Sequence, residues 1–185
     1  AGTIERVIEE LKRSSPYPME IIVVDGGSYD GTQERAINGG AKIVFDRRPG
    51  YGKAIRTGLE HTNGEAVVVI DADGTYRAED LPRLVNPLID GRADIALASR
   101  LGGTILPGAM TGLNYVGNRA FALIYNLLFR RRLKDTQTGF RALSRRALEA
   151  ITLTEDGMSI STEILTQAAK KNLRILEIPS LYKPR

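Results

Sequence analysis

Residues 66–74 read AVVVIDADG, an apolar run that ends in two aspartates and a glycine. A short run of apolar, largely β-branched residues followed by turn residues is typical of a buried strand. Similar runs occur at 21–24, 42–45, 95–98 and 175–178, and helical patterns separate the first four. This alternation predicts an α/β fold with a mostly parallel central sheet flanked by helices.

The helical patterns occupy 30–38, 54–62, 79–89, 113–129, 145–151 and 161–170. The chain also opens on a helical pattern, because Ile4, Val7, Ile8 and Leu11 have the spacing of one apolar face. Residues 102–108 contain three glycines and a proline, which predicts a mobile connection. Residues 135–141 are predicted to form a turn-rich segment.

Length and composition are those of one ordinary globular domain spanning residues 1–185. The absence of cysteine excludes disulfides, a cysteine-ligated zinc site and a thiol nucleophile. The formal charge of +4, from 26 basic and 22 acidic residues, suits an anionic ligand or a membrane surface and does not indicate nucleic acid.

Neither a bilayer-spanning run of about 20 apolar residues nor a signal-peptide pattern is found in the sequence. The sequence starts at Ala1, directly on the first helical pattern. We therefore expect a single domain truncated at both ends, and membrane spans in a longer parent stay open.

The first candidate motif is VVDGGSYDGT, residues 23–32, at the carboxyl end of a predicted strand. Ligands of open α/β sheets gather at this edge, where Asp25 would accept hydrogen bonds from a nucleoside. The alternative is structural: Asp25 and Ser28 shape a turn, and Asp30 or Thr32 caps the next helix.

The second motif is the Asp71 and Asp73 pair that follows the strand at 66–70. Two carboxylates one residue apart can converge on a hard divalent cation, Mg²⁺ or Mn²⁺, which in turn binds phosphate oxygens. A cation held there would stabilise a diphosphate leaving group. The alternative is an ordinary aspartate-rich turn.

The third motif is RRPGYGKA, residues 47–54, a basic and glycine-rich approach to a helix. Lys53 and the helix N-terminus suit a diphosphate, while the alternative is a solvated loop with surface charges. The spacing is neither that of a P-loop nor that of a Rossmann fingerprint.

Several ordered motifs together resemble the inverting glycosyltransferase family two, in its dolichol-phosphate-mannose-synthase-like branch. They are Asp25, the Asp71 and Asp73 pair, the 98–100 sequence ASR, the 135–141 sequence DTQTGFR, Glu163, the 177–179 sequence EIP, Tyr182 and Arg185. The resemblance implies the GT-A fold. Family members open with a strand and a nucleotide-binding segment that this chain lacks, so the sheet is expected without its first strand.

The resemblance also implies roles for individual residues. Asp25 is expected near the nucleoside, and Asp71 and Asp73 are expected to serve the nucleotide and the metal, while Ser28 and Lys53 stay further candidates for binding the nucleotide sugar. Arg100 is expected beside the diphosphate or the acceptor. Asn118, Arg119, Asp135 and Arg141 are candidate acceptor residues. Three positions depart from the family pattern, Gly26, Tyr29 and Thr75, and they bear on nucleotide preference and metal geometry.

The segment 113–129 is apolar and ends in Arg130, Arg131 and Arg132. Such a helix suits a bilayer interface that holds anionic lipid. The alternative is a core helix with a solvated basic end.

An inverting transferase usually needs a general base, but a phosphate acceptor is ionised at neutral pH and can attack directly. His61, the only histidine, is predicted to be a surface residue away from the motifs. Glu163 and Asp135 are the alternative bases.

We therefore expect an enzyme that moves a hexose from a UDP- or GDP-linked sugar to an acceptor, by one in-line displacement with inversion. A polyprenyl or dolichyl phosphate is the expected acceptor. The enzyme is expected at the cytoplasmic face of the membrane, held there by peripheral contact or by a tether. The alternatives are a sugar nucleotidyltransferase and a non-catalytic nucleotide-sugar-binding module. The sugar, the nucleotide, the choice between Mg²⁺ and Mn²⁺ and the oligomeric state are left open.

Overall fold

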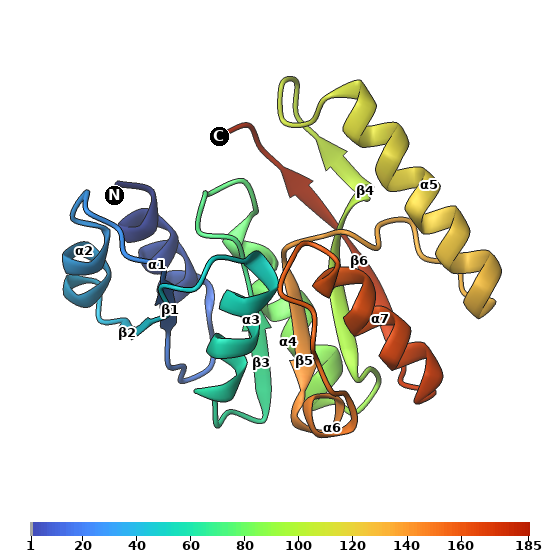
Figure 1. Cartoon of the computed structure of the whole chain (residues 1–185), viewed down its shortest axis with the longest axis horizontal. Helices are drawn as coiled ribbons and strands as arrows, with labels where there is room; N and C mark the ends of the chain where they lie inside the picture. The colour runs from blue at the N-terminus through green and yellow to red at the C-terminus, as the bar shows by residue number, and fades with distance from the viewer. Residues whose placement is uncertain (1) are drawn as a thin grey trace.

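The computed structural model describes residues 2–185, and Figure 1 shows their arrangement. The elements in chain order are α1 (Gly2–Ser14), β1 (Ile22–Asp25), α2 (Thr32–Asn38), β2 (Lys42–Phe45), α3 (Tyr51–Glu60), β3 (Ala66–Val69), the 3₁₀ helix η1 (Ala78–Asp80), α4 (Leu81–Ile89), β4 (Ile95–Ile105), α5 (Gly112–Phe129), β5 (Arg141–Ser144), α6 (Arg145–Ala150), α7 (Ile160–Lys170) and β6 (Ile175–Tyr182). The predicted α/β class is confirmed.

The described strands form two sheets. β1 and β2 pair in parallel, and a second sheet has the order β3-β5-β4-β6. Within it β4 and β6 are parallel, while β5 runs antiparallel to both β3 and β4. The central antiparallel strand β5 was not expected, because residues 141–144 are only four long and lie between a turn-rich segment and a predicted helix.

The predicted mobile connection at 102–108 is wrong in its first part. Strand β4 continues through Gly102 and Gly103 to Ile105, and its pairing with β6 shifts register between Ser99 and Thr104. A side chain on Gly103 would overlap the backbone of Ser180, so glycine is needed for the close approach of the two strands. The glycines therefore mark an irregularity in strand pairing rather than a loop.

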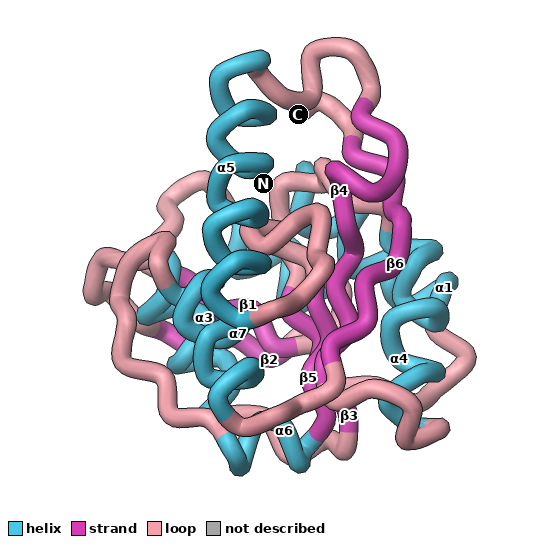
Figure 2. The backbone as a smooth tube through the Cα atoms, turned by 90° about the vertical axis from the view of Figure 1, so that its right-hand side faces the viewer, coloured by secondary structure: helices cyan, strands magenta, loops and turns pink. Residues whose placement is uncertain are grey.

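Helices cover both faces of the four-stranded sheet. On one face α1 and α4 pack on Ala96, Ala98 and Phe140, and on the other α6 and α7 pack on Ile95 and Leu143. Helix α5 lies along the outside of the molecule (Figure 2). Its Tyr125 and Phe129 pack against the apolar side chains on the α6 and α7 face of the sheet.

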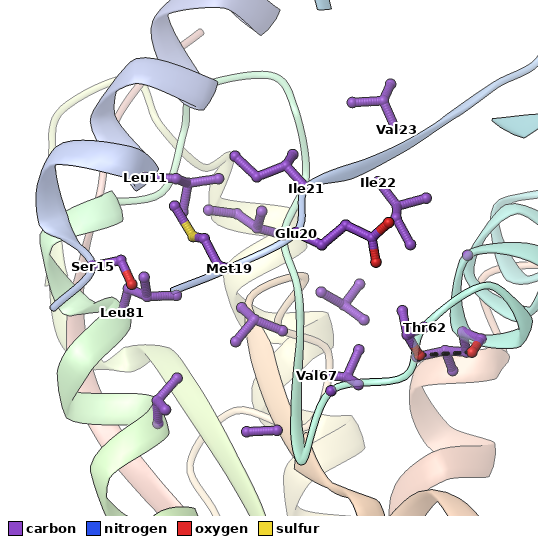
Figure 3. A pocket seen from close by; sticks show the side chains of 18 of the residues that line it. Leu11, Ser15, Met19, Glu20, Ile21, Ile22, Val23, Thr62, Val67 and Leu81 are labelled. Atoms are coloured by element: carbon purple, nitrogen blue, oxygen red, sulfur yellow. Dashed lines mark hydrogen bonds between the residues drawn. The ribbon is translucent and has the colours of Figure 1, made fainter. Parts of the chain in front are cut away.

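A cavity of about 650 Å³ separates β1 from β3. Figure 3 shows its apolar lining, with Leu11 and Leu81 from α1 and α4, Ile21 and Val23 at β1, and Val67 from β3. In the described chain, β1 and β3 each pair with a neighbour along one edge and turn the other toward this cavity.

Candidate functional site

The aspartate site lies where β3 ends, and we define it by Asp71, Asp73 and the residues that bind their carboxylates. Strand β3 stops at Val69, and Gly74, with a positive φ of 75°, turns the chain back toward the sheet. Both aspartates therefore stand at the sheet edge rather than within it. Their charges influence each other, and that of Arg141 also acts on Asp71.

Asp71 is held from two elements that are distant in sequence. The Tyr51 hydroxyl, at the start of α3, donates a hydrogen bond to Asp71 Oδ1 at 2.9 Å. Burial raises the pKa of the Asp71 carboxyl, the Tyr51 hydrogen bond opposes this, and the charge of Asp73 adds to it. A bound cation stabilises a buried carboxylate that has a like charge nearby, since the cation offsets both the cost of burial and the repulsion.

Gly139, just before β5, packs directly on Asp71. A Cβ atom at this position would overlap the Asp71 carboxylate. We expect Gly139→Ala to displace Asp71 and to weaken the binding of Mn²⁺ with a nucleotide by about tenfold or more. A tenfold loss of affinity corresponds to only about 1.4 kcal/mol of binding free energy. Isothermal titration calorimetry measures this effect.

The matched control is Gly117→Ala on α5, where a Cβ meets no atom within 4 Å. Alanine within a helix should leave binding unchanged and raise stability by about 0.5–1 kcal/mol. Equal binding by both variants would contradict the role given to Gly139.

Asp73 makes a turn and an ion pair. Its Oδ1 accepts hydrogen bonds from the Thr75 N–H at 3.1 Å and the Thr75 hydroxyl at 2.7 Å. Its Oδ2 accepts one from Arg185 Nε at 2.9 Å. Burial raises the pKa of Asp73, but the bonds from Thr75 and Arg185 outweigh it, so that the pKa is lowered overall.

Asp71 and Asp73 suit a divalent cation only if a bound ligand supplies further donor atoms. Among the described residues, no group of three or more histidine, cysteine, aspartate or glutamate side chains is placed to hold a metal ion. Mg²⁺ characteristically takes one or two protein carboxylates and completes its coordination with water and substrate phosphates. Asp71 and Asp73 match that donor set.

Arg100 and Asp135 form a buried ion pair beside the aspartate site. Arg100 Nε and Nη2 lie 2.8 and 2.9 Å from the Asp135 carboxylate oxygens, and the Arg100 N–H donates to the same carboxylate at 3.0 Å. The Asp135 residue has 0% exposure and Arg100 has 9%. The guanidinium also lies over the Tyr182 ring, 5.4 Å from its centroid. The pair uses Nε and Nη2 of Arg100, which leaves Nη1 to meet a ligand without breaking it.

Arg141 is completely buried on β5. Its Nη2 donates to Ser161 Oγ at 2.8 Å and to the Thr138 carbonyl, while Nε and Nη1 have no hydrogen-bond partner. Burial lowers the pKa of the guanidinium, against the influence of Tyr51, Tyr76 and Asp71. In this conformation the residue is shielded from solvent and acts on Asp71 only through its charge, so its predicted contact with an acceptor would require a rearrangement.

Asp25 organises the turn after β1. Its carboxylate accepts hydrogen bonds from the Gly27 and Ser28 N–H groups, the Ser28 hydroxyl at 2.5 Å and the Gln33 side chain at 2.7 Å. Burial raises the pKa of Asp25, but these bonds outweigh it and lower the pKa. The structural alternative for Asp25 and Ser28 therefore agrees with the geometry, and their predicted nucleoside contact stays a prediction.

Among the described residues, the other predicted binding residues contact groups other than Asp71 and Asp73. The Lys53 side chain pairs with Asp156, with Nζ 3.5 Å from Oδ2. Asn118 and Arg119 are on α5, where the Arg119 guanidinium lies over the Tyr115 ring. The exposed position of His61 at the end of α3 is confirmed.

Sequence reasoning assigned no role to Tyr51, Gln33 or Gly139. Tyr51 lies within the basic, glycine-rich motif, but an aromatic residue at a helix start gives no sign of a partner 20 positions away. Gly139 lies within the 135–141 motif, where its sequence context does not indicate a contact. The contact that makes it necessary exists only because β5 pairs with β3 and brings Asp71 alongside.

The fold and the paired aspartates at the end of β3 define the class of GT-A nucleotide-diphospho-sugar transferases. The chain belongs to glycosyl transferase family 2, whose sequence pattern matches residues 1–152. Glycosyltransferase AglJ of Haloferax volcanii is 40% identical over 190 residues, covering 100% of this chain and 60% of that protein. A dolichyl-phosphate hexose transferase of the same organism is 34% identical, covering 98% of this chain and 78% of its own length.

Solved structures agree with this assignment. Glucosyl-3-phosphoglycerate synthase from Mycobacterium tuberculosis, crystallised with Mn²⁺, UDP-glucose and phosphoglyceric acid, superposes with a TM-score of 0.76 at 26% identity, covering 99% of this chain and 68% of that chain. Its complex with Mn²⁺, UDP and glucosyl-3-phosphoglycerate gives a TM-score of 0.75 at 26% identity, covering 100% and 66%. The chain thus spans about two thirds of these neighbours.

Proposed function

We propose that residues 1–185 form the catalytic domain of an inverting, metal-dependent hexosyltransferase that uses a nucleotide diphosphate sugar. The observation that carries the proposal is the pair Asp71 and Asp73 at the edge of the sheet, where the burial of Asp71 and the nearby charge of Asp73 favour a bound cation. A related synthase of known structure holds Mn²⁺ and UDP-glucose. This supports UDP over GDP as the nucleotide and Mn²⁺ as the first metal to test.

The proposed chemistry is a single displacement at the anomeric carbon of the donor sugar. A divalent cation, when bound, would neutralise the negative charge that develops on the diphosphate as the bond to the sugar breaks. Asp71 and Asp73 would hold that cation, and Tyr51 and Thr75 orient their carboxylates. Arg185, which pairs with Asp73, is proposed to meet the same diphosphate.

The candidate general bases favour a phosphate acceptor. Glu163 accepts hydrogen bonds from the Thr154 N–H and hydroxyl and the Glu155 N–H. These outweigh the effect of burial and lower its pKa, which makes it a weak base. Asp135 is held by Arg100. A phosphate needs no base because it is already ionised, and a polyprenyl phosphate is the acceptor we propose.

A lipid-linked acceptor places the reaction at a membrane surface, and we propose peripheral attachment at the cytoplasmic face. The relative named as a dolichyl-phosphate hexose transferase supports this acceptor class. Among the described residues, no helix is long and apolar enough to cross a bilayer. Asn118 and Arg119 stay the proposed residues for the acceptor phosphate.

Calorimetric titration with UDP-glucose and GDP-mannose, with and without Mn²⁺, tests the proposal. We expect Mn²⁺-dependent binding of UDP-glucose. GDP-mannose should bind about tenfold more weakly, or more weakly still. Binding that is indifferent to metal would contradict the role of the aspartates. Formation of a nucleotide sugar from a sugar phosphate and a nucleoside triphosphate would instead identify a nucleotidyltransferase.

A further inference from the structure

Helix α5 exposes an apolar face to solvent. Seven of its large apolar side chains are between 55% and 83% exposed: Leu113, Val116, Phe121, Leu123, Ile124, Leu127 and Leu128. The core-helix alternative for this segment is therefore wrong. Soluble proteins rarely leave so many large apolar side chains on one continuous element unless it meets a partner.

These seven residues form one continuous surface. At 100° per residue they fall within an arc of about 160°, and the other two residues in that arc are Gly117 and Ala120. The arc contains no charged residue. Eighteen residues give a helix about 27 Å long. We call this surface the α5 apolar face.

The opposite side of α5 fixes the helix to the domain. Ala122 and Tyr125 are buried, and the Tyr125 hydroxyl donates to the Leu165 carbonyl of α7 at 2.8 Å. The Asn126 side chain bonds both the N–H and the carbonyl of Leu133. The apolar face is therefore held outward by specific contacts, as its place on the outer edge in Figures 1 and 2 also shows.

Cations border one end of the α5 apolar face. Arg130, in a left-handed conformation, ends the helix, and Arg132 and Lys134 follow as exposed residues. The helix itself contains no aspartate or glutamate. A second copy packed on this face would bring the same cations and no acid from its own α5, whereas anionic lipid supplies the missing charge.

We infer that α5 lies in the plane of an anionic bilayer surface. Its apolar face would enter the boundary between headgroups and acyl chains, and Arg130, Arg132 and Lys134 would bind lipid phosphates. The inference rests on the proposed function, which it deepens by naming the element that meets the membrane. The chain enters α5 from β4, which carries Arg100, and leaves it toward Asp135, so the docked helix is tied at both ends to the buried ion pair.

Vesicle flotation tests the inference without any acceptor. Purified protein is mixed with phosphatidylcholine vesicles that contain about 30% phosphatidylglycerol, and with vesicles of phosphatidylcholine alone. We expect binding to the anionic vesicles that the double variant Ile124→Glu/Leu127→Glu weakens by about tenfold or more, since each buried leucine-sized side chain contributes at least that factor. Arg130→Gln/Arg132→Gln should weaken binding to anionic vesicles only.

The matched control is Ile37→Glu/Ile89→Glu, which replaces side chains of 58% and 56% exposure on α2 and α4. This variant should float like the wild type. No binding by the wild type, or equal binding by the α5 variant, would overturn the inference. A dimer in analytical ultracentrifugation that the α5 variant abolishes, without vesicle binding, would assign the face to a second copy and also overturn it.

Nucleotide titration of the same variants separates this inference from the proposed function. Because the side chains of the α5 apolar face point to solvent and none of them bonds to Asp71 or Asp73, the variants should bind UDP-glucose and Mn²⁺ as the wild type does. Loss of vesicle binding with nucleotide binding intact supports the inference. Vesicle binding by a protein that takes no nucleotide sugar would support the membrane role and contradict the transferase.

Discussion

Asp73→Asn is expected to reduce metal-dependent sugar transfer by about a thousandfold while the domain stays folded. The amide keeps the oxygen that accepts from Thr75 but removes the charge that would hold a cation and that now pairs with Arg185. A cation that stabilises a leaving group contributes several kcal/mol, and about 4 kcal/mol corresponds to three orders of magnitude in rate. Transfer from UDP-glucose to a short-chain polyprenyl phosphate, measured over a range of Mn²⁺ concentrations, gives the readout.

Asp90→Asn is the matched control for this experiment. Asp90 also pairs with an arginine, at 2.9 Å from Arg92, but it lies at the end of α4 away from the aspartate site. The control should transfer sugar at the wild-type rate. Near-normal transfer by Asp73→Asn would remove the metal assignment altogether.

Asp135→Ala is expected to lower the free energy of unfolding by about 3–5 kcal/mol, because it leaves the Arg100 charge buried without a partner. The side chains of this pair are 10% and 0% exposed, and the carboxylate also accepts from the Gln137 N–H at 3.1 Å. Equilibrium unfolding in urea, followed by circular dichroism, measures the change.

Asp90→Ala again provides the comparison, since it breaks an ion pair whose side chains are 62% and 53% exposed. An exposed pair of this kind contributes about 0–1 kcal/mol. If both alanine variants lost the same small amount, Arg100 and Asp135 would be an accessible pair, free to exchange with a ligand.

Strands β1, β2 and β3 could be predicted from sequence because each reads as a short, largely apolar run followed by turn residues. Strand β5 begins with Arg141, whose charge hides it from any hydropathy pattern, and the residue is buried only because the completed fold surrounds it. The glycines of β4 predicted a loop because their need for close contact with Ser180 depends on the partner strand.

The same distinction applies to the candidate site. Asp71 and Asp73 were identifiable because a strand pattern ends directly before them. The ion pair of Arg100 with Asp135 joins positions 35 apart, and that of Asp73 with Arg185 joins positions 112 apart. Such pairs follow from topology and not from local spacing. The exposure of α5 could not be predicted either, because the sequence does not show how much of the helix surface its neighbours cover.

The cavity between β1 and β3 has a mechanical consequence. Asp25 belongs to the two-stranded sheet and Asp71 follows the four-stranded one, and in the described chain no backbone hydrogen bonds between strands join the two sheets. The β1–β2 unit should therefore open locally at a lower free energy than the rest, and its amide protons should exchange sooner. A ligand that binds Asp25 and Asp71 together would join the two sheets across this cavity. Its binding energy would then appear as slower exchange in β1 and β2, far more than in β4.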